Sequence, residues 1–162
     1  SIGLDGRTVL ALVVCVAVAC MLWWAYFAFI PEVGEHRLRA ATGQARGVLA
    51  RDFYTFGHFP LVFGLVLYAV VVKHLVPHPN GHLLHDDRWL LGLSVVFFVG
   101  GLLAIQWRAV RRLAPERVAA IPVAAGLCAL GSVLPALVIV AAVAVTYSVM
   151  TAITWHRYRA TR

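Results

Sequence analysis

Charged residues are scarce in this chain of 162 amino acids: they make up 13% of it, whereas 62% of the residues are hydrophobic. A water-soluble fold of this composition would lack the polar surface needed to cover its own core. The few charges are gathered in short clusters between long apolar runs. The shortage of charge therefore excludes a soluble globular domain and predicts a multi-pass protein of the cell membrane, with the lipid bilayer as its first partner.

Several chemical motifs are absent as well. The sequence has no Gly-rich phosphate loop, no Gly-X-Ser-X-Gly motif and no paired carboxylates inside an apolar run, so hydrolase and nucleotide-driven functions have no support. Cys15, Cys20 and Cys128 form no CxxC pair and lie in apolar runs, and we interpret them as small packing residues. The net charge of +7 has no soluble domain on which to form a basic patch, so no nucleic-acid partner is predicted.

Long apolar segments predict the fold. The first one ends in an aromatic belt of Trp23, Trp24 and Tyr26 rather than in a small-residue cleavage site, so it is interpreted as a spanning helix and not as a signal peptide. The last apolar block is too long for one crossing, and we expect Pro135 to break it while Gly131 ends the preceding helix in a left-handed turn. The prediction is one all-α domain over residues 1–162, a polytopic transmembrane bundle of five helices at about 8–29, 53–76, 89–107, 118–130 and 135–155.

The basic residues predict the orientation, because cytoplasmic loops collect Lys and Arg. With the amino terminus outside and the carboxyl terminus cytoplasmic, five helices leave only Arg7, Lys73 and Arg88 of the 14 basic residues outside. The inner basic residues lie in two loops and the tail: Arg37, Arg39, Arg46, Arg51, Arg108, Arg111, Arg112, Arg117, Arg157, Arg159 and Arg162. We therefore predict contacts with anionic lipids at the cytoplasmic face.

One polar segment, RDFYTFGHFP, enters the second predicted helix. At about 100° per residue, Tyr54, His58 and Tyr68 fall within an arc of about 80° on that helix. Gly57 and Gly64 flank this stripe, as small residues do where two membrane helices pack tightly. The candidate polar cluster comprises Arg51, Asp52, Tyr54, His58 and Tyr68. Two interpretations stay open: interface anchors with a satisfied packing histidine, or a buried polar site with a function of its own.

A histidine-rich segment, KHLVPHPNGHLLHDDRW, follows the same helix. His74, His78 and His82 recur four residues apart, a spacing that would align them for zinc on a helix. Pro77, Pro79, Asn80 and Gly81 prevent a regular helix there, so we predict a solvated outer turn and no metal or other cofactor. The histidines and acids of this turn are His74, His78, His82, His85, Asp86 and Asp87.

The aromatic LWWAYF, the Arg-rich segment after it and LARDFYTFGHFPLVFGLVLYAVVVKHLVPHP together resemble the second half of the bacterial low temperature requirement A family, over about residues 22–80. The positions that match the family pattern are Trp24, Tyr26, Arg51, Tyr54, His58 and Pro60. The acidic segment that opens family members is absent, and Ala28 stands where an acidic residue is often found. The resemblance implies a bacterial inner-membrane protein linked to growth in the cold, and it implies no chemistry.

The missing opening segment and a first residue that is not Met lead us to expect a piece of a longer chain, associated with its other half or with a second copy. Two functional classes remain. The first is a non-catalytic membrane component, a carrier or channel for a small solute. The alternative is a redox or lipid-modifying enzyme in which His58 ligates haem or acts as acid and base. The remaining histidines fall in loops or at helix ends, so the first class ranks higher.

Overall fold

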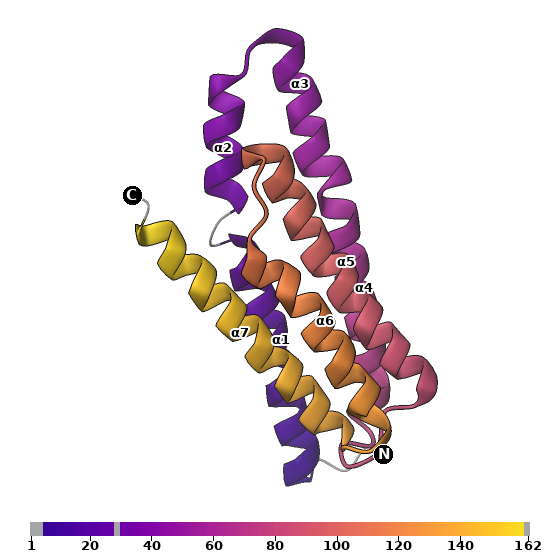
Figure 1. Ribbon diagram of the computed structural model, residues 1–162. Coiled ribbons are helices and arrows are strands. Elements are labelled where there is room, and N and C mark those ends of the chain that lie inside the picture. The colour runs from indigo at the N-terminus through magenta and orange to yellow at the C-terminus, as the bar shows by residue number, and fades with distance from the viewer. Residues whose placement is uncertain (1–4, 28–29, 161–162) are drawn as a thin grey trace.

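The computed structural model describes residues 5–27 and 30–160, except for the side chains of 31–33 and 158–160. Its described residues form a helical bundle (Figure 1). The elements in chain order are α1 (Gly6–Phe27), α2 (Ile30–Ala40), α3 (Gly43–Arg51), a π-helical turn (Asp52–Phe56), α4 (His58–Leu75), α5 (His85–Val110), α6 (Pro115–Ala129), a 3-10 turn (Leu130–Ser132) and α7 (Ala136–Ala160).

Four helices in the described part of the chain are long and apolar enough to cross a membrane: Gly6–Phe27, Gly43–Leu75, His85–Val110 and Ala136–Arg157. Large apolar side chains point outward along them; Val13 is 60% exposed and Val145 62%. Such a surface is favourable in lipid and unfavourable in water. The predicted helices 8–29, 53–76, 89–107 and 135–155 each overlap one of these spans, and residues 28–29 lie outside the described part. Most of the predicted fourth helix, 118–130, falls in α6, which has 15 residues, ends at Ala129 and is not among these four spans.

The four long apolar spans and α6 alternate in direction along the chain, so their connections gather at two ends of the bundle (Figure 1). At one end the N–H of Ala136 donates to the carbonyl of Gly81 at 2.8 Å, which joins the turn before α7 to the turn before α5. At the other end Arg157 of α7 pairs with Glu116 of α6 at 3.3 Å. Helix α4 packs along α5, and α6 lies between α5 and α7. We call the end that holds Glu116 the arginine end.

The polar segment after α1 is helical, which differs from the Arg-rich loop expected from the sequence. Helices α2 and α3 extend the bundle at the arginine end (Figure 1). Glu35 and Arg39 form an ion pair one turn apart, and Arg37 and Arg39 lie in the last turn of α2, where cations suit the helix dipole. The turn between the two helices needs Gly43, whose φ of +56° is left-handed.

The break before α7 has a different geometry from the one predicted. Gly131 has no positive φ, so the expected left-handed helix end is wrong. Residues Leu130–Ser132 instead tighten into a 3-10 turn, a common way to end an α-helix. A Cβ on Gly131 would lie 3.1 Å from side-chain atoms of Leu83 and Arg88, so the glycine gives these side chains room to pack closely against the turn.

Candidate functional site

The polar segment predicted from the sequence contains an irregular helical turn. Between α3 and α4 the chain forms a π-helical turn over Asp52–Phe56, in which the N–H of Gly57 donates to the carbonyl of Asp52 at 2.9 Å. Pro60 lies just beyond; it has no N–H, and its ring crowds the carbonyl four residues earlier, which interrupts a regular α-helical ladder. Such wide turns are frequent at functional sites.

His58 uses both of its ring nitrogens. Nδ1 lies 2.9 Å from the carbonyl oxygen of Phe53, and Nε2 lies 2.7 Å from the hydroxyl of Tyr26 on α1. A carbonyl can only accept, so Nδ1 carries the proton in the neutral ring and Nε2 accepts from the Tyr26 O–H. The two rings also meet edge to face, with centroids 5.2 Å apart. His58 therefore connects α1 to the start of α4.

The two other aromatic members of the predicted cluster lie in different surroundings. Tyr54 is 56% exposed, and its ring stacks on that of His58 with centroids 5.9 Å apart. Tyr68 is buried, and its hydroxyl donates to the backbone carbonyl of Cys15 on α1 at 2.9 Å. The structure thus brings Tyr54 and His58 together and places Tyr68 at a separate contact between α4 and α1.

The charged members of the cluster lie at the arginine end. Asp52 accepts from Nε of Arg108, on α5, at 2.9 Å and lies 3.4 Å from the Arg51 guanidinium. Arg51 also lies over the ring of Phe56, 5.4 Å from its centroid. The contact between Asp52 and Arg108 holds the π-helical turn against α5.

The aromatic belt predicted at the end of α1 divides in the structure. Trp23 and Trp24 are 62% and 58% exposed, while Tyr26 turns inward to His58.

Glycines allow α4 to approach α5 closely. A Cβ on Gly64 would lie 2.8 Å from the backbone nitrogen of Phe98 and 2.8 Å from the backbone oxygen of Ser94. A Cβ on Gly57 would overlap the side chain of Ile105. The absence of a side chain at these two positions is therefore a steric requirement of this helix pair.

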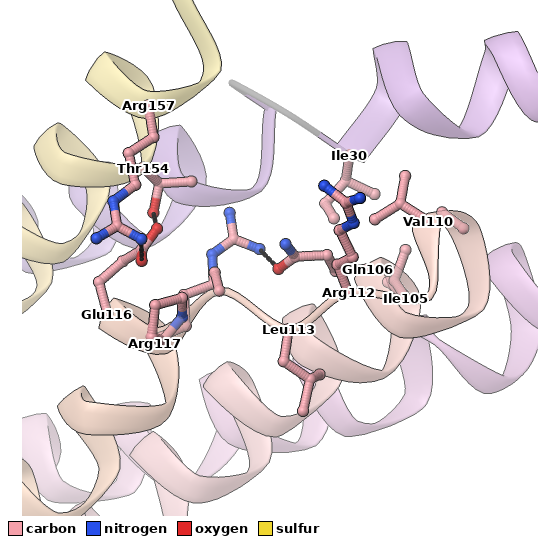
Figure 2. A pocket seen from close by; sticks show the side chains of 13 residues that line it. Ile30, Ile105, Gln106, Val110, Arg112, Leu113, Glu116, Arg117, Thr154 and Arg157 are labelled. Atoms are coloured by element: carbon pink, nitrogen blue, oxygen red, sulfur yellow. Dashed lines mark hydrogen bonds and ion pairs between the residues drawn. The ribbon is translucent and has the colours of Figure 1, made fainter. Parts of the chain in front are cut away.

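A cavity of about 350 Å³ opens at the arginine end, between the last turns of α5, the start of α6 and the end of α7 (Figure 2). Its polar lining comes from three guanidinium groups, one carboxylate, one amide and one hydroxyl. The residues that carry them are Arg112, Arg117, Arg157, Glu116, Gln106 and Thr154. Ile30 and Ile105 form part of the apolar wall, and Ile105 is also the residue that contacts Gly57. The cavity therefore adjoins the polar cluster.

Most polar groups of the cavity are joined in pairs (Figure 2). Nη1 of Arg117 donates to Oε1 of Gln106 at 3.3 Å. Glu116 accepts from the Thr154 hydroxyl at 3.0 Å and pairs with Arg157 at 3.3 Å. Arg117 is 2% exposed and precedes the apolar part of α6, and its guanidinium stays charged at neutral pH as arginine does in proteins. The cavity therefore contains a buried positive charge.

The histidine-rich turn lies at the opposite end of the bundle. His74 Nδ1 is 2.7 Å from Oδ1 of the buried Asp87, and His85 contacts both Arg88 and Trp89. Among the residues that the structure describes, no group of three or more His, Cys, Asp or Glu side chains has an arrangement that could hold a metal ion. The His74–Asp87 pair connects the end of α4 to the start of α5.

The sequence analysis did not identify the cavity. Its clearest sequence feature is the pair Glu116 and Arg117, two charged residues immediately before an apolar helix. Thr154, in the last apolar run, is a second such feature. The sequence does not indicate the partners of these residues. Gln106 and Arg117, for example, lie on different helices and meet only in the folded bundle.

Comparison with known proteins gives one match. The family model described as "Bacterial low temperature requirement A protein (LtrA)" matches residues 1–152. This match extends well beyond residues 22–80, over which the resemblance was specific in the sequence analysis. No curated protein and no solved structure matches the chain.

Proposed function

The chain belongs to the bacterial low temperature requirement A family, and we propose that this multi-pass membrane protein is a carrier or channel component for a small solute. The observation that supports the proposal is the polar cavity at the arginine end. Its volume of about 350 Å³ lies within the range of small-molecule sites, and it holds a buried guanidinium and an amide among apolar walls. Ionisable groups at such positions in membrane proteins usually mark a solute path.

We further propose five crossings, with the amino terminus outside and the arginine end in the cytoplasm of the bacterial inner membrane. The alternation of helix directions and the concentration of arginines at one end support this orientation. The 15 residues of α6 span only about 22 Å, less than a hydrocarbon core of about 30 Å. The non-helical link 112–114 carries the chain the remaining depth on the cytoplasmic side, and anionic headgroups bind the arginines there.

His58 supports the alternative, a redox or lipid-modifying enzyme, less well. A haem ligand or general base needs a free ring nitrogen, and Nε2 of His58 accepts from Tyr26 while Nδ1 donates to Phe53. The visible absorption spectrum of the purified protein tests the haem form directly, and a Soret band would reverse this ranking.

Thiol accessibility tests the carrier or channel proposal without knowledge of the solute. In a variant without the native cysteines, Ala109→Cys places a thiol at the cavity wall with little change in volume. We expect a membrane-impermeant thiol reagent to reach it from the inner face of inverted vesicles and also from the outer face of intact cells. Ala144→Cys is the matched control, because Ala144 is also buried and lines no described cavity; it should react from neither side. Reaction of Ala109→Cys from the inner face alone would contradict a transport path through this cavity.

A further inference from the structure

We propose that a groove between α5 and α6 binds an anionic phospholipid, with the lipid phosphate on Arg88 and His85 and one acyl chain along the apolar floor beside them. This α5–α6 groove lies at the end of the bundle opposite the arginine end, where α5 begins and α6 ends (Figure 1). The inference is therefore independent of the cavity at the arginine end and of the function proposed for it.

The α5–α6 groove has a volume of about 350 Å³ and is polar at one end only. Its polar end is formed by His85, Arg88 and Trp89, at the start of α5. The floor beyond them is small or apolar and includes Gly92, Leu93, Val96 and Cys128. Leu93 and Val96 are each 42% exposed, so the floor opens to the surface of the bundle that faces lipid. A polar end beside an apolar floor matches the two parts of a phospholipid.

The polar end of the groove lies at the depth of the lipid headgroups. Trp89 and Trp107 bracket the apolar run of α5, which is about 27 Å long and close to a hydrocarbon core of about 30 Å. Tryptophans at the ends of a spanning helix lie at the two interfaces of the bilayer. Arg88 is therefore level with the lipid phosphates, and the floor from Gly92 onward is level with the acyl chains.

The Arg88 guanidinium has no acidic partner among the described residues. Its hydrogen-bonding contact there is with His85, and its Nε–H is buried without a partner. No acidic side chain of the described chain lines the groove, and the neighbouring Asp87 pairs with His74 instead. A half-buried cation without an opposite charge is costly, and a phosphate would compensate it through charge-assisted hydrogen bonds.

His85 directs a second donor to the same place. Its Nε2 accepts from the indole N–H of Trp89 at 3.0 Å, and its Nδ1 lies 3.2 Å from Nη2 of Arg88. Indole and guanidinium groups only donate, and a neutral imidazole has a single acceptor nitrogen. With Nε2 accepting, Nδ1 carries the proton and faces another donor. A phosphate oxygen between the imidazole and the guanidinium would accept from both.

The test measures the thermal unfolding midpoint of the purified chain in detergent, because a ligand of the folded state raises it. Dioleoylphosphatidylglycerol is the complete ligand, added in mixed micelles. Dioleoylglycerol has the same acyl chains and no phosphate. Sodium phosphate has no chains and is compared with sodium chloride at equal ionic strength.

Two variants change the two halves of the site. Arg88→Gln removes the charge and keeps carbon atoms at the Cγ and Cδ positions, which pack against Gly131. Gly92→Leu fills the floor, and its Cβ would meet only the Cys128 sulfur, at 4.0 Å, so α5 can accept it. Arg7→Gln is the matched control: Arg7 is an exposed cation in the first turn of α1, at the same end of the bundle, and lines no described cavity (Figure 1).

We expect dioleoylphosphatidylglycerol to raise the midpoint more than either partial ligand does. Arg88→Gln and Gly92→Leu should each weaken its apparent affinity about tenfold, and Arg7→Gln should leave it unchanged. An equal rise with sodium phosphate would overturn the lipid as occupant, and an equal rise with dioleoylglycerol would overturn the role of the phosphate. A rise that Arg88→Gln retains in full would overturn the inference, because the lipid would then bind elsewhere on the bundle. Circular dichroism of each variant confirms that its helices are intact, and Arg88→Gln decides the outcome if Gly92→Leu does not fold.

Discussion

The hydrogen bond between Tyr26 and His58 provides a quantitative test of the contact between α1 and α4. Tyr26→Phe removes one hydroxyl and keeps the ring that meets the imidazole edge to face. His58→Phe removes two hydrogen bonds, the one from Tyr26 and the one to the Phe53 carbonyl. The double variant completes a thermodynamic cycle, because Tyr26→Phe has no bond left to remove once His58 is gone.

The expected magnitudes follow from the number of bonds lost. Side-chain hydrogen bonds in membrane proteins contribute about 0.6 kcal/mol on average and at most about 1.7. Tyr26→Phe should therefore lower the free energy of unfolding by about 0.6 to 1.7 kcal/mol, and His58→Phe by about 1 to 3. The coupling energy of the pair should equal the effect of Tyr26→Phe alone, since the hydroxyl has this one partner among the described residues.

Unfolding of the detergent-solubilised protein by a denaturing detergent, followed by circular dichroism, measures these free energies. Tyr54→Phe is the control: Tyr54 is 56% exposed, its hydroxyl has no hydrogen bond to a described residue, and its loss should cost less than about 0.5 kcal/mol. An effect of Tyr54→Phe as large as that of Tyr26→Phe would refute the assignment. A full effect of Tyr26→Phe in the His58→Phe background would refute it as well.

Three further predictions concern packing, topology and growth. Gly64→Ala places a Cβ 2.8 Å from α5 backbone atoms and should destabilise by about 1 to 3 kcal/mol in the same unfolding assay, whereas Gly100→Ala meets nothing within 4 Å and should be neutral or slightly stabilising. Single cysteines at the exposed Asn80 and Gln44 should be labelled from outside intact cells only at position 80; labelling of both would contradict the orientation. With His58→Gln, growth of a cold-sensitive deletion strain should follow protein abundance, because both ring nitrogens of His58 serve internal bonds. Lost growth at normal abundance would assign His58 a direct role.

The spanning helices were predictable because each rests on a local property, an apolar run of sufficient length. The predicted segments 8–29, 89–107 and 135–155 overlap α1, α5 and α7 for this reason. The helices α2 and α3 were not predicted, because both are short and polar on average, and helices this short depend on contacts with the rest of the bundle. Length and hydropathy do not report such contacts.

The candidate site was predictable only in part. His58 was identified because an ionisable residue in an apolar helix requires a partner, but the partner, Tyr26, lies 32 residues away on another helix. The helical projection that placed Tyr54, His58 and Tyr68 on one stripe assumed a constant α-helical period. The π-helical turn over Asp52–Phe56 contains an i→i+5 hydrogen bond and breaks that period, so Tyr54 is exposed while Tyr68 is buried.

Helix α5 connects the polar cluster to the cavity through residues of one short stretch. Ile105 occupies the space left by Gly57 and also lines the cavity. Gln106, the next residue, accepts from Arg117 inside the cavity, and Arg108 pairs with Asp52 in the π-helical turn. A shift of the π-helical turn along α5 would therefore displace Ile105 and Arg108, and with them the amide that faces the buried guanidinium. Because packed helices tolerate few intermediate arrangements, such a shift would alter the cavity in a discrete step rather than gradually.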